Sequence, residues 1–153
     1  MQLAGSCFCG AVRFTVSTTT PYPYRRCYCG RCRKTAGGTG ADANILAQAS
    51  TLSVDGADSL TEFAAPDATR TRFCSVCGSA RYLTIDAAPD YVYPFASAID
   101  SPLPEPPERV HVFTAEAPAW AKPPSSPDDY STERNTRESI ADWHRRHGLT
   151  ERD

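Results

Sequence analysis

Three cysteines lie within six positions in the segment "CYCGRCRK", which spans residues 27–34. Cys27, Cys29 and Cys32 can each supply a thiolate, and a fourth ligand would complete the tetrahedron that zinc prefers. Three protein ligands are the usual number at a catalytic zinc, whose fourth position takes water or substrate. The cluster therefore favours an open zinc site with these three cysteines as catalytic ligands. The alternative is that a loop residue, or a residue of a second subunit, closes the shell.

Four further cysteines form two short pairs that are far apart in the sequence, Cys7 with Cys9 and Cys74 with Cys77. Pairs contributed by distant segments are typical of structural zinc sites, where metal binding adds directly to folding stability. We therefore expect a closed four-cysteine site and two zinc ions per chain. Seven cysteines are an odd number, which excludes complete pairing into disulfides.

The sequence around the three-cysteine cluster is basic. Arg25, Arg26, Arg31, Arg33 and Lys34 surround it, and no acidic residue interrupts this stretch. Positive charge lowers thiol pKa values and attracts anionic substrates. We predict that Arg31, Arg33 and Lys34 bind the carboxylates of a small thiol. The alternative is that these cations only offset the negative charge of a zinc–thiolate shell.

A glycine-rich stretch, "TAGGTGADA", follows the basic cluster. It is too rich in glycine for a regular element and brings the backbone close to a neighbour. We predict that Gly37 and Gly38 contribute to the binding of the substrate through backbone N–H groups.

Short strands must position these clusters. Val12, Phe14 and Val16 alternate with polar residues, which predicts a half-buried strand after the first cysteine pair. The stretch "TRTRFCSVCGSARYLTI" places the last pair in a turn between two strands, and Asp55-Gly56 predicts another turn. Further strands are expected in "DYVYPFASAI" and in "RVHVFTA", where His111 should be a packed, hydrogen-bonded residue. The fold class is therefore mainly β.

The C-terminal part differs in composition. Ten of the thirteen prolines lie from Pro89 to Pro127, so we expect loops and edge strands there rather than the centre of a sheet. Asn135 is a candidate N-cap for a single helix that ends at Gly148. Trp120 should pack over the sheet.

These features predict a zinc-binding β domain over 1–122 and a proline-rich linker with a C-terminal helix over 123–153. Trp143 should dock the helix, either onto its own chain or onto a second subunit. The second arrangement would make the protein a homodimer through this helix.

The quoted motifs resemble those of the glutathione-dependent formaldehyde-activating enzymes, whose domain is shared with centromere protein V. The resemblance rests on "GSCFCGAVRF", "CYCGRCRK" followed by "TAGG", "RFCSVCGS", "AID" before a proline stretch, and "HVF" ahead of "APAW". It runs from about Gly5 to Trp120 and includes all seven cysteines in order. Two features depart from it: Tyr28 stands where many members have histidine, and "AKPPSSPDDYS" replaces the usual ending.

The resemblance implies a β-tent fold of short antiparallel strands with a closed four-cysteine zinc and an open three-cysteine zinc. It also implies condensation of glutathione with formaldehyde to S-hydroxymethylglutathione, formally a carbon–sulfur lyase reaction. A non-catalytic, zinc-scaffolded binding module of the same fold is the alternative, because fold does not fix function.

Composition argues against other classes of partner. A net charge of −2 argues against nucleic-acid binding. No apolar run approaches the roughly 20 residues that cross a membrane. The N-terminal sequence has no basic patch followed by an apolar stretch, so we expect a cytoplasmic protein.

Overall fold

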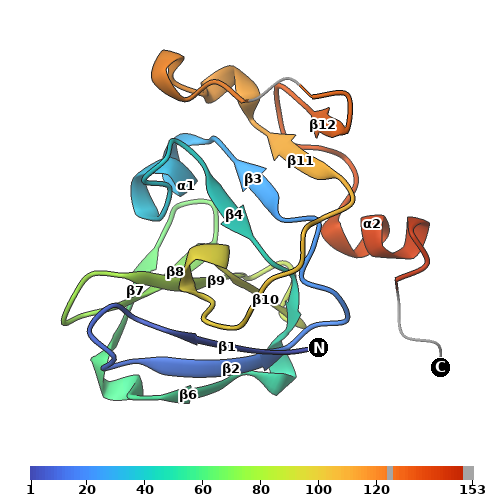
Figure 1. Ribbon diagram of the computed structural model, residues 1–153. Coiled ribbons are helices and arrows are strands. Elements are labelled where there is room, and N and C mark those ends of the chain that lie inside the picture. Colours follow the sequence, from blue (N-terminus) through green and yellow to red (C-terminus); the bar gives the residue numbers. More distant parts are fainter. Residues whose placement is uncertain (124–125, 150–153) are drawn as a thin grey trace.

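The computed structural model describes residues 1–123 and 126–149. Pro124 and Ser125 of the expected linker, and residues 150–153, lie outside the described residues. The described chain forms a three-stranded, a five-stranded and a four-stranded sheet. In the view of Figure 1 these lie at the bottom, the middle and the top, respectively. The mainly β fold with a C-terminal helix, predicted from the sequence, is confirmed.

The three-stranded sheet carries the first cysteine pair at the turn between its first two strands. These strands pair antiparallel, and alternate residues point inward, among them Leu3, Phe14 and Val16. The strand after the cysteine pair was predicted, whereas the strand before it was not. The sheet has the order β1-β2-β6, with β1 (Gln2–Ser6), β2 (Arg13–Ser17) and β6 (Ser53–Asp55).

The five-stranded sheet is antiparallel throughout and carries the second cysteine pair. Cys74 ends one strand and Cys77 lies in the turn to the next, as predicted. The order is β5-β10-β9-β8-β7, with β5 (Ala47–Gln48), β7 (Leu60–Ala64), β8 (Thr69–Cys74), β9 (Ala80–Ile85) and β10 (Tyr91–Pro94).

The main core lies between these two sheets. Their facing strands contribute large apolar side chains that are almost fully buried, and this burial is the main source of folding stability. The buried members of the cluster are Leu3, Phe14, Val16, Ile45, Ala47, Tyr82, Leu83, Val92, Phe95 and Ala98.

The four-stranded sheet carries the three-cysteine cluster. Its order is β12-β11-β3-β4, with β3 (Arg25–Cys27), β4 (Asp42–Asn44), β11 (Arg109–Val112) and β12 (Asp129–Ser131). β3 pairs antiparallel with β4 but parallel with β11, and β11 pairs parallel with β12. Helix α1 (Gly30–Thr35) follows β3 directly. Short 3-10 turns complete the structure at Ala49–Thr51, Ala57–Ser59, Ala96–Ala98, Thr114–Glu116 and Ala119–Ala121.

The expectation that the proline-rich region avoids sheet centres is wrong in two places. β10 lies second in its sheet, and β11 lies between two partners. Pro94 is tolerated because it is the last residue of β10, where its carbonyl still accepts a hydrogen bond from Ile45 at 2.9 Å. β11 contains no proline. β12, in the segment read as a linker, was not predicted.

Helix α2 (Ile140–Arg146) begins later than predicted. Ser139, rather than Asn135, is the N-cap: its hydroxyl accepts from the N–H of Asp142, whose carboxylate accepts from the N–H of Ser139. The predicted N-cap at Asn135 is wrong, because the reciprocal bonds between Ser139 and Asp142 form a capping box four residues later. The predicted stop is confirmed, because Gly148 follows the helix at φ +66°. Among the described residues no helix is both long and apolar enough to cross a membrane.

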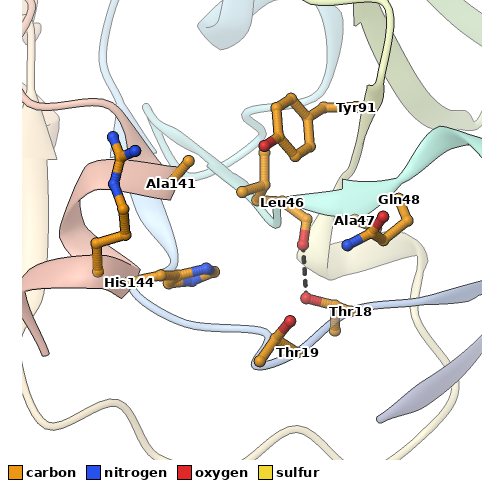
Figure 2. A pocket seen from close by; sticks show the side chains of 9 residues that line it. Thr18, Thr19, Leu46, Ala47, Gln48, Tyr91, Ala141 and His144 are labelled. Carbon is orange, nitrogen blue, oxygen red and sulfur yellow. Dashed lines mark hydrogen bonds between the residues drawn. The ribbon is translucent and has the colours of Figure 1, made fainter. Parts of the chain in front are cut away.

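One face of α2 packs against the β-strands. The other face borders a cavity of about 210 Å³, which Thr18 and Tyr91 also line (Figure 2). On the face that packs against the strands, Trp143 is buried and shares an apolar cluster with Val110. Its indole N–H donates to Glu108 at 2.7 Å. The helix therefore docks on its own chain.

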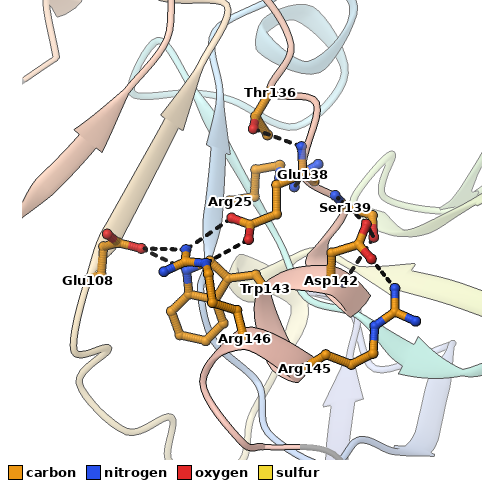
Figure 3. A network of polar contacts seen from close by, with 9 residues as sticks. All are labelled: Arg25, Glu108, Thr136, Glu138, Ser139, Asp142, Trp143, Arg145 and Arg146. Atoms are coloured by element: carbon orange, nitrogen blue, oxygen red, sulfur yellow. Dashed lines mark hydrogen bonds and ion pairs between the residues drawn. The ribbon is translucent and has the colours of Figure 1, made fainter.

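Ion pairs support this docking (Figure 3). Arg146 binds Glu138 at 2.7 Å and lies 4.0 Å from Glu108. Arg25, on β3, donates to the backbone carbonyl of Glu138 at 2.6 Å. The strand that leads to the three cysteines is thereby tied to the C-terminal segment. The domain boundary at 122/123 and a homodimer through α2 stay predictions.

Two single-residue expectations have opposite outcomes. His111 is fully buried, and its Nδ1 lies 3.0 Å from the hydroxyl of Tyr28, so the prediction of a packed, hydrogen-bonded histidine is confirmed. Trp120 is 69% exposed, so the prediction that it packs over the sheet is wrong. Its ring instead lies beside Gly40, in the loop after α1.

A glycine substitution tests the turn between β6 and β7. Gly56 has φ +75°, and a Cβ there would lie 1.9 Å from the carbonyl oxygen of Ala11. Gly56→Ala should lower the free energy of unfolding by more than about 2 kcal/mol, since the left-handed conformation alone costs roughly 1–2 kcal/mol. Gly148→Ala is the control, because Gly148 has φ +66° with nothing within 4 Å of its Cβ position. Equal Tm losses for the two variants would contradict the steric argument.

Candidate metal centres

The four-cysteine cluster joins the first two sheets. The sulfur atoms of Cys7, Cys9, Cys74 and Cys77 all lie within 4.8 Å of one another. Each pair is held by a turn with a left-handed glycine. Gly10, at φ +76°, donates to the carbonyl of Cys7 at 3.0 Å, and Gly78, at φ +74°, donates to the carbonyl of Cys74 at 2.8 Å.

The spacing of these sulfurs fits a zinc ion. Four sulfurs at about 2.3 Å from zinc in a tetrahedron lie roughly 3.8 Å from one another. The Sγ atoms of Cys7 and Cys9 are 3.5 Å apart, and those of Cys9 and Cys74 are 3.8 Å apart. Disulfide sulfurs lie only about 2.05 Å apart, and all seven cysteines are free. The geometry therefore fits the predicted closed site.

The three-cysteine cluster lies where β3 passes into α1. The sulfurs of Cys27, Cys29 and Cys32 also lie within 4.8 Å of one another. Cys29 caps α1, because its sulfur accepts from the backbone N–H of Cys32 at 3.5 Å. Among residues 1–123 and 126–149, no carboxylate or histidine joins these three sulfurs as a candidate fourth ligand. Cys27 and Cys32 are buried, whereas Cys29 is half-buried, so ligands would enter from its side.

The local interactions lower the pKa of Cys29 in the three-cysteine cluster and the pKa values of Cys7 and Cys77 in the four-cysteine cluster. The pKa of Cys29 is lowered to about 2, because the thiols of Cys27 and Cys32 donate hydrogen bonds to its thiolate. The pKa of Cys77 is lowered to about 5, chiefly because the hydroxyl of Ser79, 3.1 Å away, donates to its sulfur. Metal ligation needs deprotonated sulfur, and a bound cation would favour that form at the remaining cysteines of each cluster.

Arg31 has an acidic partner within the fold. Its guanidinium forms an ion pair with Asp67, donates to the hydroxyl of Thr69 at 2.7 Å and lies 3.9 Å from the sulfur of Cys32. These contacts connect α1 to β8 and place a positive charge beside a sulfur of the three-cysteine cluster. They are consistent with charge compensation, and the predicted contact of Arg31 with substrate stays a prediction.

The other predicted substrate residues line a cavity of about 380 Å³ between α1 and the second cysteine turn. We call this the Arg33 cavity. Arg33 and Lys34 contribute from α1, Gly37 and Gly38 from the loop that follows it. The structure therefore places these four residues on one surface, while their role stays a prediction.

A second cavity of about 380 Å³ was not predicted. We call it the Arg26 cavity. Its wall includes Tyr28, which lies between two cysteines of the three-cysteine cluster, and the cations Arg26 and Lys122. Gly38 lines both cavities. Arg26 was noted as part of the basic cluster, but strand alternation on β3, which sends it to the opposite face from Cys27, could have singled it out.

Two carboxyl groups beside the three-cysteine cluster were also missed. Asp42 pairs with Cys27 across the β3–β4 ladder, and burial raises its pKa to about 7. Glu116 accepts from the backbone N–H of Gly30 at 2.9 Å, at the start of α1. Neither residue could be recognised from the sequence, because both lie outside the cysteine segment and approach the cluster only in the folded chain.

Comparison with known proteins supports the reading of the cysteines. The family described as "Glutathione-dependent formaldehyde-activating enzyme" matches residues 2–116. The chain belongs to this family. The resemblance predicted from the cysteine motifs is therefore confirmed.

Two individual proteins extend this comparison. A Halomonas elongata protein named "Putative glutathione-dependent formaldehyde-activating enzyme" is 47% identical over 99% of both chains. It therefore also matches the C-terminal segment that follows the family region. A crystal structure of a Rhodobacter sphaeroides protein superposes with a TM-score of 0.57 at 27% identity, covering 67% of this chain and 92% of that one.

Two serine variants test the different roles of the clusters. Cys74→Ser removes a ligand that joins two sheets, so it should abolish one metal site and lower the Tm by at least about 10 °C. Cys29→Ser should abolish the other metal site and change the Tm by only a few degrees, because the three-cysteine cluster lies within one local segment. Metal content and thermal melting measure both effects. Similar Tm losses for the two variants would contradict this division.

Proposed function

We propose that this protein is a zinc-dependent enzyme of carbon–sulfur lyase type that joins a small thiol, glutathione or a similar compound, to formaldehyde or another carbonyl. One observation carries the proposal most directly: three sulfurs converge within 4.8 Å with no fourth side-chain ligand among the described residues. The family and the name of the Halomonas elongata relative support glutathione and formaldehyde as substrates.

The reaction is an addition. The sulfur of the thiol forms a bond to the carbonyl carbon, the C=O π bond breaks, and the thiol proton ends on the new hydroxyl oxygen. A bound zinc would lower the pKa of a thiol at its fourth position and act as a Lewis acid. Cys27, Cys29 and Cys32 would hold that ion.

The remaining residues would bind and orient the thiol. Arg33 and Lys34 would attract its carboxylates, while the backbone at Gly37 and Gly38 would approach it closely. Arg31 would keep positive charge beside the sulfurs. Holding the thiol beside the carbonyl carbon accelerates the addition because it removes most of the entropy cost of the encounter.

A non-catalytic binding module is the second candidate, and one observation favours it. Phe8 and Val76, on the turns of the two cysteine pairs, are 95% and 67% exposed. Exposed apolar side chains are typical of contact surfaces. Phe8 and Val76 lie at the four-cysteine cluster, so a contact surface there would not explain why the three-cysteine cluster lacks a fourth ligand among the described residues.

The uncatalysed addition also occurs, so the test must measure acceleration. Exchange between ¹³C-formaldehyde and its glutathione adduct can be followed by NMR. The zinc-loaded protein should accelerate this exchange at least tenfold, and Cys29→Ser, with its fold confirmed by circular dichroism, should not. Acceleration that survives in Cys29→Ser would refute the proposed function and leave the binding module.

Gly38 offers a test of where the thiol binds. A side chain there would meet nothing within 4 Å, so the fold and the metal sites should tolerate Gly38→Leu. The new side chain would enter the space shared by the two cavities and should raise the KM for the thiol roughly tenfold. Ala57→Leu, on the exposed turn after β6, is the control for added apolar bulk. An unchanged KM in Gly38→Leu would place the thiol elsewhere.

The proposal also includes the cellular compartment of the protein and its assembly. Seven free cysteines suit a reducing compartment, so we retain the cytoplasm as the proposed location. A homodimer through α2 is retained as a proposal, although Trp143 is already buried against its own chain.

A further inference from the structure

The Arg26 cavity contains the features of a carboxylate site. Arg26 and Lys122 are its two cationic wall residues, and Thr39 and Ser97 add hydroxyl groups. Neither cation forms an ion pair among the described residues, whereas Arg31 is already paired with Asp67. Unpaired cations on a concave wall are suited to an anionic ligand, since charge-assisted hydrogen bonds are among the stronger polar contacts.

Strand alternation directs the carboxyl of Asp42 away from Arg26. Arg26 pairs directly with Ala43 on β4, so the two side chains share one face of the sheet. Asp42, the acidic residue of this wall, precedes Ala43 and by alternation points to the opposite face, that of Cys27. The carboxyl of Asp42 therefore does not compete with a ligand for Arg26.

The position of Lys122 is fixed by a close contact between two loops. Gly40 has φ +94°, and a Cβ there would lie 2.2 Å from the Cβ of Ala121 and 3.3 Å from the ring of Trp120. Because Gly40 has no side chain, the 119–121 turn can approach the loop after α1. The residue that follows this turn, Lys122, then lies on the cavity wall.

The cavity under α2 lacks these features. Its arginine, Arg145, is paired with Asp142 (Figure 3). The Nε2 of His144 lies 2.7 Å from the carbonyl oxygen of Tyr22. Of the two cavities, only the Arg26 cavity has unpaired cations among the described residues and adjoins Tyr28, between two ligand cysteines.

We propose that the Arg26 cavity binds a carboxylate on one arm of the thiol substrate, with Arg26 as the specificity-determining residue and Lys122 as its support. This inference rests on the proposed function, because the sulfur of the same substrate would lie at the three-cysteine cluster. Recognition of the thiol would then depend on Arg26, whose side chain projects from the face of β3 opposite to that of Cys27.

The experiment compares Arg26→Gln with wild type against three thiols. They are glutathione, glutathione amide, which lacks the glycine carboxylate, and γ-aminobutyryl-cysteinylglycine, which lacks the γ-glutamyl carboxylate. Dissociation constants are measured by calorimetry on the zinc-loaded protein. Arg26→Gln should weaken glutathione about tenfold and leave one of the two analogues unaffected, because that analogue lacks the carboxylate that Arg26 contacts. Lys122→Gln should show the same pattern with a smaller loss.

Arg13→Gln is the control, since Arg13 is an exposed arginine on β2 without an ion pair among the described residues. An unchanged affinity for glutathione in Arg26→Gln, or equal losses for all three thiols, would overturn the inference. The proposed function fails separately: Arg26-dependent binding without any acceleration of formaldehyde exchange would refute the lyase and leave the carboxylate site intact. Formaldehyde exchange that is accelerated equally by wild type and Arg26→Gln would refute the carboxylate site and leave the lyase intact.

Discussion

The close approach of cysteine sulfurs from distant segments is the constraint on which this structure depends. Seven sulfurs gather into two clusters, each within 4.8 Å, and ionised thiolates at such distances disfavour one another. A bound cation would remove that penalty, and its binding free energy would then become folding free energy. The four-cysteine cluster would benefit most, because it connects a turn of the three-stranded sheet to a turn of the five-stranded sheet beside the main core.

The three-cysteine cluster would use the same metal chemistry for the proposed reaction rather than for stability. It lies within one strand–helix segment, so the convergence of its sulfurs is largely local. Cys29 both caps α1 and belongs to the three-cysteine cluster, which ties the direction of the helix to the geometry of the cluster. The residue that follows Cys27, Tyr28, returns to the other face of β3 and reaches His111, whose Nε2 lies 3.6 Å from the carboxylate of Asp129. The late strands β11 and β12 thereby support the wall beside the cluster.

The sequence was sufficient where the signal was local. Cysteine spacing predicted both clusters, alternation predicted β2, and the two strand-like runs around the last cysteine pair predicted β8 and β9. It was insufficient where tertiary context decides. Trp120 is an apolar residue whose neighbour, Gly40, lies eighty positions away, so no local pattern predicted its exposure. The start of α2 was misplaced because Asn135 and Ser139 both carry N-cap signals, and the reciprocal bonds with Asp142 select Ser139. Arg26 and Lys122 converge through β-sheet register and loop contact, which single-sequence reasoning does not supply.

The central claim is that the three-cysteine cluster holds an ion whose fourth position accepts an external sulfur. Anomalous diffraction at the zinc edge, from crystals grown with and without glutathione, tests it most directly. The account predicts two zinc peaks per chain, with four cysteine sulfurs around one and three around the other, where the glutathione sulfur occupies the fourth position. A side chain of the protein in that position in both crystals, or no peak at Cys27, Cys29 and Cys32, would contradict it.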